Sequence, residues 1–129
     1  MNSKNTKRDA YMCIHRGDVL LINYGCGDAG CRNSIVRPSV VISSETSIKQ
    51  ERSLLIVPLY RHETRAINAS DVLIKATDCT GLRYDEYAQP LQVKAVKKCR
   101  VVKKIGHIKD ELKVNEITAA LQDYTKGRG

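Results

Sequence analysis

Arg37, which is followed directly by Pro38, is the residue of this sequence whose type and position best suit the binding of an anion. It stands between the glycine-rich polar segment 25–34 and an apolar run that begins at Ser39. Proline fixes its own φ angle and biases the preceding residue toward an extended conformation. A guanidinium group binds phosphate oxygens through a planar fork of N–H donors. The pattern predicts a phosphate-binding arginine at a strand start; the alternative interpretation is an ordinary surface arginine.

Thiols and imidazoles are the other groups that could carry chemistry. The cysteines are Cys13, Cys26, Cys31, Cys79 and Cys99, and the histidines are His15, His62 and His107. An odd number of cysteines without a secretory signal favours free thiols. Cys26 and Cys31 are close in sequence, but a zinc site needs two more ligands and no histidine has a paired spacing with them. We therefore expect no metal and no other cofactor; a reversible disulfide in that loop is the alternative.

The composition indicates a protein that meets polyanions. The 129 residues include 22 Lys and Arg against 14 Asp and Glu, which gives a formal net charge of +8 and a pI of about 9.4. RNA, DNA, an anionic membrane surface and an acidic protein segment all fit such a charge. Charge alone does not choose among them.

The length predicts one domain with a real core. We expect it to span residues 13–125, after a disordered basic arm (residues 1–12) and before a short tail (residues 126–129). No apolar stretch approaches the roughly 20 residues that span a bilayer, and the N-terminus carries no apolar signal sequence. We expect a cytoplasmic protein with no membrane partner.

Most of the secondary-structure elements that the sequence predicts around Arg37 are strands. Apolar and β-branched runs predict strands at residues 17–24, 39–44, 54–60, 71–74, 87–96 and 100–105. Pro58 cannot donate to a ladder and is expected at a bulge or edge. In the fifth of these runs, Gln92 and Lys94 fall on one face and Val93 and Ala95 on the other.

The last part of the chain has a helical period. Val114, Ile117, Leu121 and Tyr124 form one apolar stripe, and Asp110 is suited to the N-cap. We expect this helix to bury its stripe against the sheet. The predicted fold is mainly β with α, a small and strongly bent antiparallel sheet closed by one terminal helix.

Four short segments together carry a resemblance to a known family. They are Arg16-Gly17-Asp18-Val19, Arg37-Pro38-Ser39-Val40-Val41-Ile42-Ser43, Leu55-Ile56-Val57-Pro58-Leu59 and Lys103-Lys104-Ile105-Gly106-His107-Ile108 with Asp110-Glu111 after it. In this order and spacing, over about residues 15–124, they resemble the MazF/PemK (Kid) family of toxin-antitoxin ribonucleases. The resemblance implies an SH3-like small β-barrel with a C-terminal helix, as in MazF, PemK and CcdB. It also implies a homodimer, metal-independent cleavage of single-stranded RNA, and a cognate antitoxin with an acidic tail.

The resemblance also implies roles for particular residues. Arg37 matches the family's conserved arginine, which would stabilise the charge that builds up when a ribose 2′-hydroxyl attacks the neighbouring phosphorus. The family's loop motif Gly-Ser-Glu-Gln is replaced by Gly30-Cys31-Arg32-Asn33, which we expect to contact RNA. The family's threonine is replaced by Tyr60, expected as a substitute catalytic partner, and Arg61 follows it as an RNA contact.

Gln92 and Lys94 stand where the family often has Gln-x-Arg, so the resemblance implies that they also contact RNA. The alternative for this pair is a solvated strand face.

The departures at the loop acid and the threonine leave a second functional class open. The chain could be a non-catalytic module that binds RNA, DNA or an acidic antitoxin segment through the same barrel. A third alternative is inhibition of a topoisomerase, because the gyrase poison CcdB shares the fold, but no residue in the sequence supports it.

Overall fold

The computed structural model of the chain describes residues 13–25 and 35–126. The predicted arm at residues 1–12 lies outside them, as do the predicted RNA contacts Gly30, Cys31, Arg32 and Asn33 and the cysteine Cys26.

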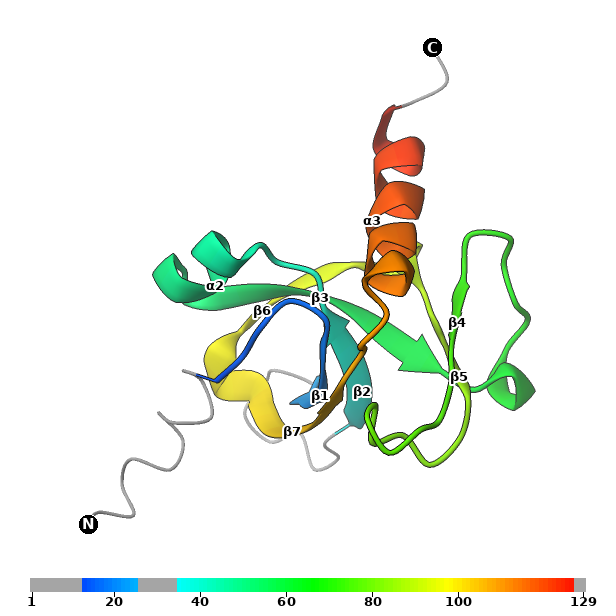
Figure 1. Cartoon of the computed structure of the whole chain (residues 1–129), viewed down its shortest axis with the longest axis horizontal. Coiled ribbons are helices and arrows are strands. Elements are labelled where there is room, and N and C mark those ends of the chain that lie inside the picture. Colours follow the sequence, from blue (N-terminus) through cyan, green and yellow to red (C-terminus); the bar gives the residue numbers. More distant parts are fainter. Residues whose placement is uncertain (1–12, 26–34, 127–129) are drawn as a thin grey trace.

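Within the described residues, antiparallel strands form one sheet of seven (Figure 1). The strands are β1 (Asp18–Asn23), β2 (Val36–Val41), β3 (Ser53–Tyr60), β4 (Val72–Ile74), β5 (Glu86–Ala88), β6 (Lys94–Lys97) and β7 (Val101–His107). Their order is β4-β5-β3-β2-β1-β7, and β6 pairs with the first half of β3. The helices are α2 (Glu45–Gln50) and α3 (Glu111–Lys126), with single 3-10 turns η2 (His62–Thr64), η3 (Pro90–Gln92) and η4 (Lys98–Arg100). None of these helices is long and apolar enough to cross a membrane.

The sheet buries side chains on both faces. Successive residues of a strand point to opposite faces, so Val40 packs in one core and Val41 in the other. The first core lies under α3, whose Ile117 is fully buried. The second lies under α2, which contributes Ile48. Burying each such side chain stabilises the fold by about 1.5–3 kcal/mol.

The helix α3 begins where the sequence predicts. The Asp110 carboxylate accepts a hydrogen bond from the Leu112 N–H (3.0 Å), as an N-cap residue does. Val114 and Ile117 are buried in the first core, but the side chain of Tyr124 is 66 % exposed. The prediction that the whole stripe is buried was wrong at Tyr124, because the end of α3 extends beyond the sheet (Figure 1).

The single strand predicted over residues 87–96 was wrong as well. The chain stops pairing after Ala88 and forms the η3 turn, which begins with Pro90. The strand β6 then starts at Lys94 and pairs with a different part of β3. Pro58 lies where β3 changes partner, after Ile56 pairs with β6 and before Leu59 pairs with β5, so its missing N–H leaves no ladder bond unmade.

The sheet curls until its two ends meet. The turn after β4 packs on β7, where the His107 N–H donates to the carbonyl oxygen of Cys79 (2.7 Å). Gly81 has a φ of +72°, and a Cβ there would lie 2.0 Å from the carbonyl oxygen of Ile105. Only glycine permits both that backbone conformation and that close approach.

Candidate functional site

A hollow of about 380 Å³ opens on the sheet at the start of β2. We call it the Arg37 groove, and its lining residues are Tyr24, Gly25, Ile35, Arg37, Pro58, Arg65, Gln89, Gln92 and Lys94. Three of the side chains that the sequence selected, Arg37, Gln92 and Lys94, therefore meet in one place.

Arg37 is held on a regular part of the sheet. It is the second residue of β2, paired in register with Ile22 of β1, and the next residue, Pro38, pairs with Leu21. Its side chain is exposed. Within the described part of the chain, no carboxylate forms an ion pair with the guanidinium. A cation that is fixed by its backbone and has no such partner is available to an anion from solution.

Tyr24 forms one wall of the groove, just past the end of β1. Its hydroxyl shares a hydrogen bond with the hydroxyl of Ser39 (2.5 Å). Burial raises the pKa of Tyr24, while the bond to Ser39 and the charge of Arg37 act in the opposite direction. Lys94 holds its ammonium group 5.2 Å from the ring centroid. The wall is thus a neutral aromatic ring with a positive charge close to it.

The η3 turn contributes Gln92, and the residue directly before it, Gln89, to the lining of the groove. The Gln89 N–H donates to the carbonyl oxygen of Pro58 (3.1 Å), which ties the turn to β3. Gln89 is buried, with 5 % of its surface exposed. Gln92 is exposed at the end of the turn. Each amide carries two donors and one acceptor oxygen and can pair with the edge of a nucleobase or with a phosphate.

The structure does not bring Tyr60 or Arg61 into the groove. Tyr60 is 3 % exposed, and its hydroxyl donates to the Asp71 carboxylate (2.5 Å). Burial and that carboxylate raise the pKa of Tyr60 to about 12. The Arg61 guanidinium stacks 4.0 Å above the ring of Tyr84. The predicted loop contacts Gly30, Cys31, Arg32 and Asn33 lie outside the described residues.

Three lining residues with polar side chains, Tyr24, Gln89 and Arg65, were not among the predicted site residues. Arg65 belongs to a charged segment whose composition indicates only a solvated connection. Gln89 was hidden because residues 87–96 looked like one continuous strand. Its position directly before Pro90 was the available signal, because proline favours the first position of a helical turn.

Glu86 is a half-buried carboxyl at the beginning of β5. Burial raises its pKa, and the positive charges of Arg61 and Arg37 oppose that rise. The acid therefore lies within the electrostatic influence of Arg37 without pairing with it.

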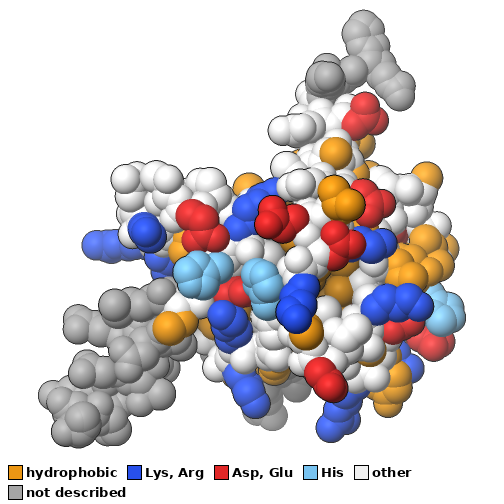
Figure 2. Space-filling view, viewed as in Figure 1, with side chains coloured by type: hydrophobic (Ala, Val, Ile, Leu, Met, Phe, Trp, Pro, Cys, Tyr) orange, Lys and Arg blue, Asp and Glu red, His pale blue; other side chains and the backbone are white. Residues whose placement is uncertain are grey.

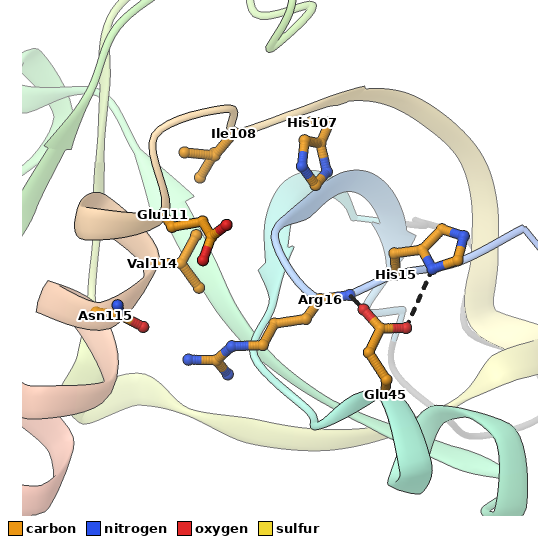
Figure 3. Close-up of a pocket in the computed structure, with 8 residues that line it drawn as sticks. All are labelled: His15, Arg16, Glu45, His107, Ile108, Glu111, Val114 and Asn115. Atoms are coloured by element: carbon orange, nitrogen blue, oxygen red, sulfur yellow. Dashed lines mark hydrogen bonds and ion pairs between the residues drawn. The ribbon is translucent and has the colours of Figure 1, made fainter.

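A second hollow, of about 340 Å³, lies between α2 and the start of α3 (Figure 3). Its polar groups mostly bind one another. Glu45 accepts hydrogen bonds from His15 Nδ1 (3.1 Å) and the Arg16 N–H (3.0 Å), while the Arg16 guanidinium donates to Thr118 Oγ1 (2.8 Å). Such contacts join the segment that precedes β1 to α2 and α3. We therefore interpret this hollow as structural and take the Arg37 groove as the candidate site.

Beneath the second hollow lies a buried carboxylate. Asp18 accepts hydrogen bonds from His107 Nδ1 (2.7 Å), Lys104 Nζ (3.0 Å) and the His15 N–H (2.7 Å). On the face of the molecule seen in Figure 2, acidic and basic side chains are interspersed and no large area of one charge forms. In residues 13–25 and 35–126, no group of three or more His, Cys, Asp or Glu side chains is arranged to hold a metal ion.

Residues 15–125 match the family model described as the PemK-like, MazF-like toxin of type II toxin-antitoxin systems. No curated protein sequence matches the chain.

Solved structures share the fold. An endoribonuclease in complex with its cognate antitoxin from a mycobacterial species is 18 % identical, covers 91 % of this chain and 99 % of its own, and has a TM-score of 0.68. MazF from Deinococcus radiodurans is 13 % identical, with 88 % and 97 % covered and a TM-score of 0.68. Toxin MazF-mt6 from Mycobacterium tuberculosis is 12 % identical, with 87 % and 99 % covered and a TM-score of 0.65. The predicted mainly β fold with a C-terminal helix is confirmed.

Proposed function

The chain belongs to the PemK-like, MazF-like toxin family of type II toxin-antitoxin systems, and from that premise we propose that it is an endoribonuclease. It cleaves single-stranded RNA in the Arg37 groove without a metal cofactor. The observation that carries the proposal is the Arg37 guanidinium, exposed, held by a regular strand and free of any described carboxylate partner, in a groove that also contains Arg65 and Lys94.

The reaction is an internal transfer. The ribose 2′-oxygen forms a bond to the adjacent phosphorus as the bond to the 5′-oxygen breaks, which leaves a 2′,3′-cyclic phosphate and a 5′-hydroxyl end. The proton of the 2′-hydroxyl leaves, and the departing 5′-oxygen takes one up. Negative charge grows on the phosphoryl oxygens in the transition state, so a fixed guanidinium stabilises that state more than the ground state. The 2′-hydroxyl requirement restricts the substrate to RNA.

The polar walls supply the remaining contacts. The amides of Gln89 and Gln92 are suited to the edge of an unpaired base, and Lys94 to a neighbouring phosphate. Tyr60 takes no part in proton transfer, because it is buried and its hydroxyl donates to Asp71. In the proposed enzyme the Arg37 guanidinium touches the reacting phosphate.

The partners follow from the family and the charge. One similar structure is an endoribonuclease in complex with its cognate antitoxin, and another is a MazE-MazF complex. We extend this to the present chain: an acidic antitoxin segment binds it as an inhibitor, favoured by the net charge of +8. The protein forms a homodimer and acts in the cytoplasm, where single-stranded RNA is found.

One observation favours a second candidate function, binding of RNA without cleavage. The hydroxyl group at the family's threonine position is here buried and engaged, so a catalytic partner is missing from that wall. Such a protein would bind RNA with strong salt dependence and release it intact.

The test is incubation of the purified chain with mixed-sequence single-stranded RNA in the presence of EDTA, followed by denaturing electrophoresis. The parent should cleave RNA and leave DNA of the same sequence intact. Arg37→Gln should lose cleavage, whereas Arg83→Gln, a matched change at an exposed arginine outside the groove, should keep it. Intact RNA that is nonetheless bound by the parent would favour the binding function.

A further inference from the structure

We propose that Arg65 is a second phosphate-binding arginine of the groove, and that Tyr60 is present in this chain to position it. Arg37 and Arg65 together bind the phosphate at which RNA is cut. This inference rests on the proposed function and assigns roles in it to Arg65 and Tyr60.

The connection between β3 and β4 is folded at both ends. At its start, the Thr64 N–H and hydroxyl both donate to the carbonyl oxygen of Arg61 (3.0 and 2.7 Å). At its end, the Asp71 carboxylate accepts from the Asn68 N–H (3.0 Å), and the Asp71 N–H donates to the Asn68 carbonyl oxygen (3.0 Å). Arg65 lies between these two turns, so its backbone is confined although its side chain is exposed.

Tyr60 ties this connection to the sheet. Its hydroxyl donates to Asp71 Oδ2 (2.5 Å) and lies 3.3 Å from the carbonyl oxygen of Ala66. Its ring packs beside the ring of Tyr87, with 5.9 Å between the centroids. The Tyr60 hydroxyl therefore holds the connection between β3 and β4 in place, and the Tyr87 ring holds the Tyr60 ring in place.

The Arg65 guanidinium lies over that fixed ring. Its central carbon is 5.4 Å from the Tyr60 ring centroid, within the range of a cation–π contact. No described carboxylate forms an ion pair with Arg65. The positive charge is thus oriented by an uncharged surface and stays available to an anion.

The strand register places this platform next to Arg37. Ser39 of β2 pairs with Pro58 of β3. The pairing of β2 with β3 ends there, and Arg37 and Tyr60 each lie two residues beyond that pair, on neighbouring strands. Pro58 lines the groove together with Arg37 and Arg65. The two guanidinium groups therefore reach one groove, Arg37 from the strand β2 and Arg65 from the connection that follows β3.

Two guanidinium groups suit a phosphodiester that gains charge. Each can donate to a different non-bridging oxygen, and both bonds strengthen as the transition state forms. The role of Arg65 also explains why this chain has tyrosine at position 60, where the family has threonine. A threonine-sized side chain at position 60 would provide neither the ring under Arg65 nor a hydroxyl that reaches Asp71. Tyr60 is accordingly a positioning residue, and Arg65 touches the substrate.

The experiment compares the parent with Arg65→Gln, Arg65→Lys, Tyr60→Phe and the double variant Tyr60→Phe/Arg65→Gln, with Arg83→Gln as the control. Two quantities are measured: the single-turnover cleavage rate of mixed-sequence RNA, and the affinity for the same RNA made non-cleavable by 2′-O-methylation, at several salt concentrations. Arg65→Gln should lower the rate by about 100-fold. It should also reduce the slope of log affinity against log salt by about 0.7, the loss of one phosphate contact on a single strand. The cleavage rate of Arg65→Lys should lie between those of the parent and Arg65→Gln, because lysine keeps the positive charge but loses the planar fork of donors.

Tyr60→Phe keeps the ring and removes the hydroxyl, so it should lower the rate by less than Arg65→Gln. The double variant should be no slower than Arg65→Gln alone, because both changes act on the same guanidinium. A merely structural role for Tyr60 would give independent, multiplying effects. Far-UV circular dichroism and melting temperatures identify any variant that fails to fold, and Arg65→Gln, at an exposed position, still decides the question.

The outcomes separate the two proposals. If Arg65→Gln keeps the parent's rate and salt slope while Arg37→Gln loses cleavage, the arginine pair is refuted and the nuclease stands. If the parent leaves RNA intact but Arg65→Gln still reduces the salt slope, the nuclease is refuted and the pair stands as a binding site. If the parent cleaves nothing and the slope is unchanged, both are refuted.

Discussion

Replacing Asp18 with asparagine tests the interpretation that the second hollow is structural. The Asp18 side chain is 1 % exposed and accepts hydrogen bonds from His107, Lys104 and the His15 N–H. Asparagine has nearly the same volume but removes the negative charge and turns one acceptor oxygen into a donor. Breaking a buried charged pair costs about 3–5 kcal/mol. Lys104 and His107 have side chains 35 % and 46 % exposed and can regain water, so we expect the lower end, about 3 kcal/mol.

The assay is urea unfolding followed by circular dichroism, with thermal melting alongside. For a chain of this length about 1 kcal/mol corresponds to roughly 4 °C, so Asp18→Asn should melt about 12 °C below the parent. Glu116→Gln is the control, because it removes an exposed pair with Lys113 (3.7 Å) and should cost under about 0.5 kcal/mol. At a temperature where the variant is folded, its rate of RNA cleavage should equal the parent's. A loss of stability below about 1 kcal/mol, or a folded variant that no longer cleaves RNA, would refute the reasoning.

Further predictions concern stability. Gly81→Ala should destabilise the fold by about 2 kcal/mol or more in urea unfolding, because alanine at positive φ is strained and its Cβ would meet the carbonyl oxygen of Ile105; an unchanged midpoint would contradict this. Ile117→Ala should cost about 2–5 kcal/mol, whereas Tyr124→Ala, at an exposed position on the same helix, should cost under about 0.5 kcal/mol. Burial raises the pKa of Glu86, so the folded state favours the protonated carboxyl. The resulting contribution to the free energy of unfolding is present at low pH and is lost as the pH rises through the pKa of the folded state. Glu86→Gln should therefore raise the melting temperature at pH 7.5 and leave it unchanged at pH 4; equal melting temperatures at both pH values would count against that sign.

Local sequence pattern predicted most of the fold. The apolar run 54–60 is the strand β3, and the stripe that includes Val114 and Ile117 docks α3 on the sheet, because burial of those side chains decides both elements. The alternation of side chains gave a wrong strand prediction where a proline restricts the backbone. Pro90 favours a helical turn and divides the expected strand 87–96 in two. The prediction from pattern was wrong again at Tyr124, because helical period says nothing about how far the sheet extends beneath a helix.

Three predicted site residues, Arg37, Gln92 and Lys94, line one groove, and their roles toward RNA stay a prediction. Arg65 could not be found from the sequence, because its placement depends on where the Tyr60 ring points. That direction is set by contacts with Asp71 and Tyr87, which are 11 and 27 residues away along the chain. Side-chain direction at the end of a strand is a tertiary property, and one chain's sequence carries no local sign of it.

The most direct test of the account is the single-turnover rate at which the parent and Arg37→Gln cleave one single-stranded RNA, measured in EDTA with the product ends identified by mass spectrometry. We expect products with 2′,3′-cyclic phosphate and 5′-hydroxyl ends. We also expect a rate about 10²–10³-fold lower for Arg37→Gln, as when one preorganised donor to a developing anion is removed. Products with 5′-phosphate ends, or an Arg37→Gln variant that cleaves as fast as the parent, would contradict the proposal.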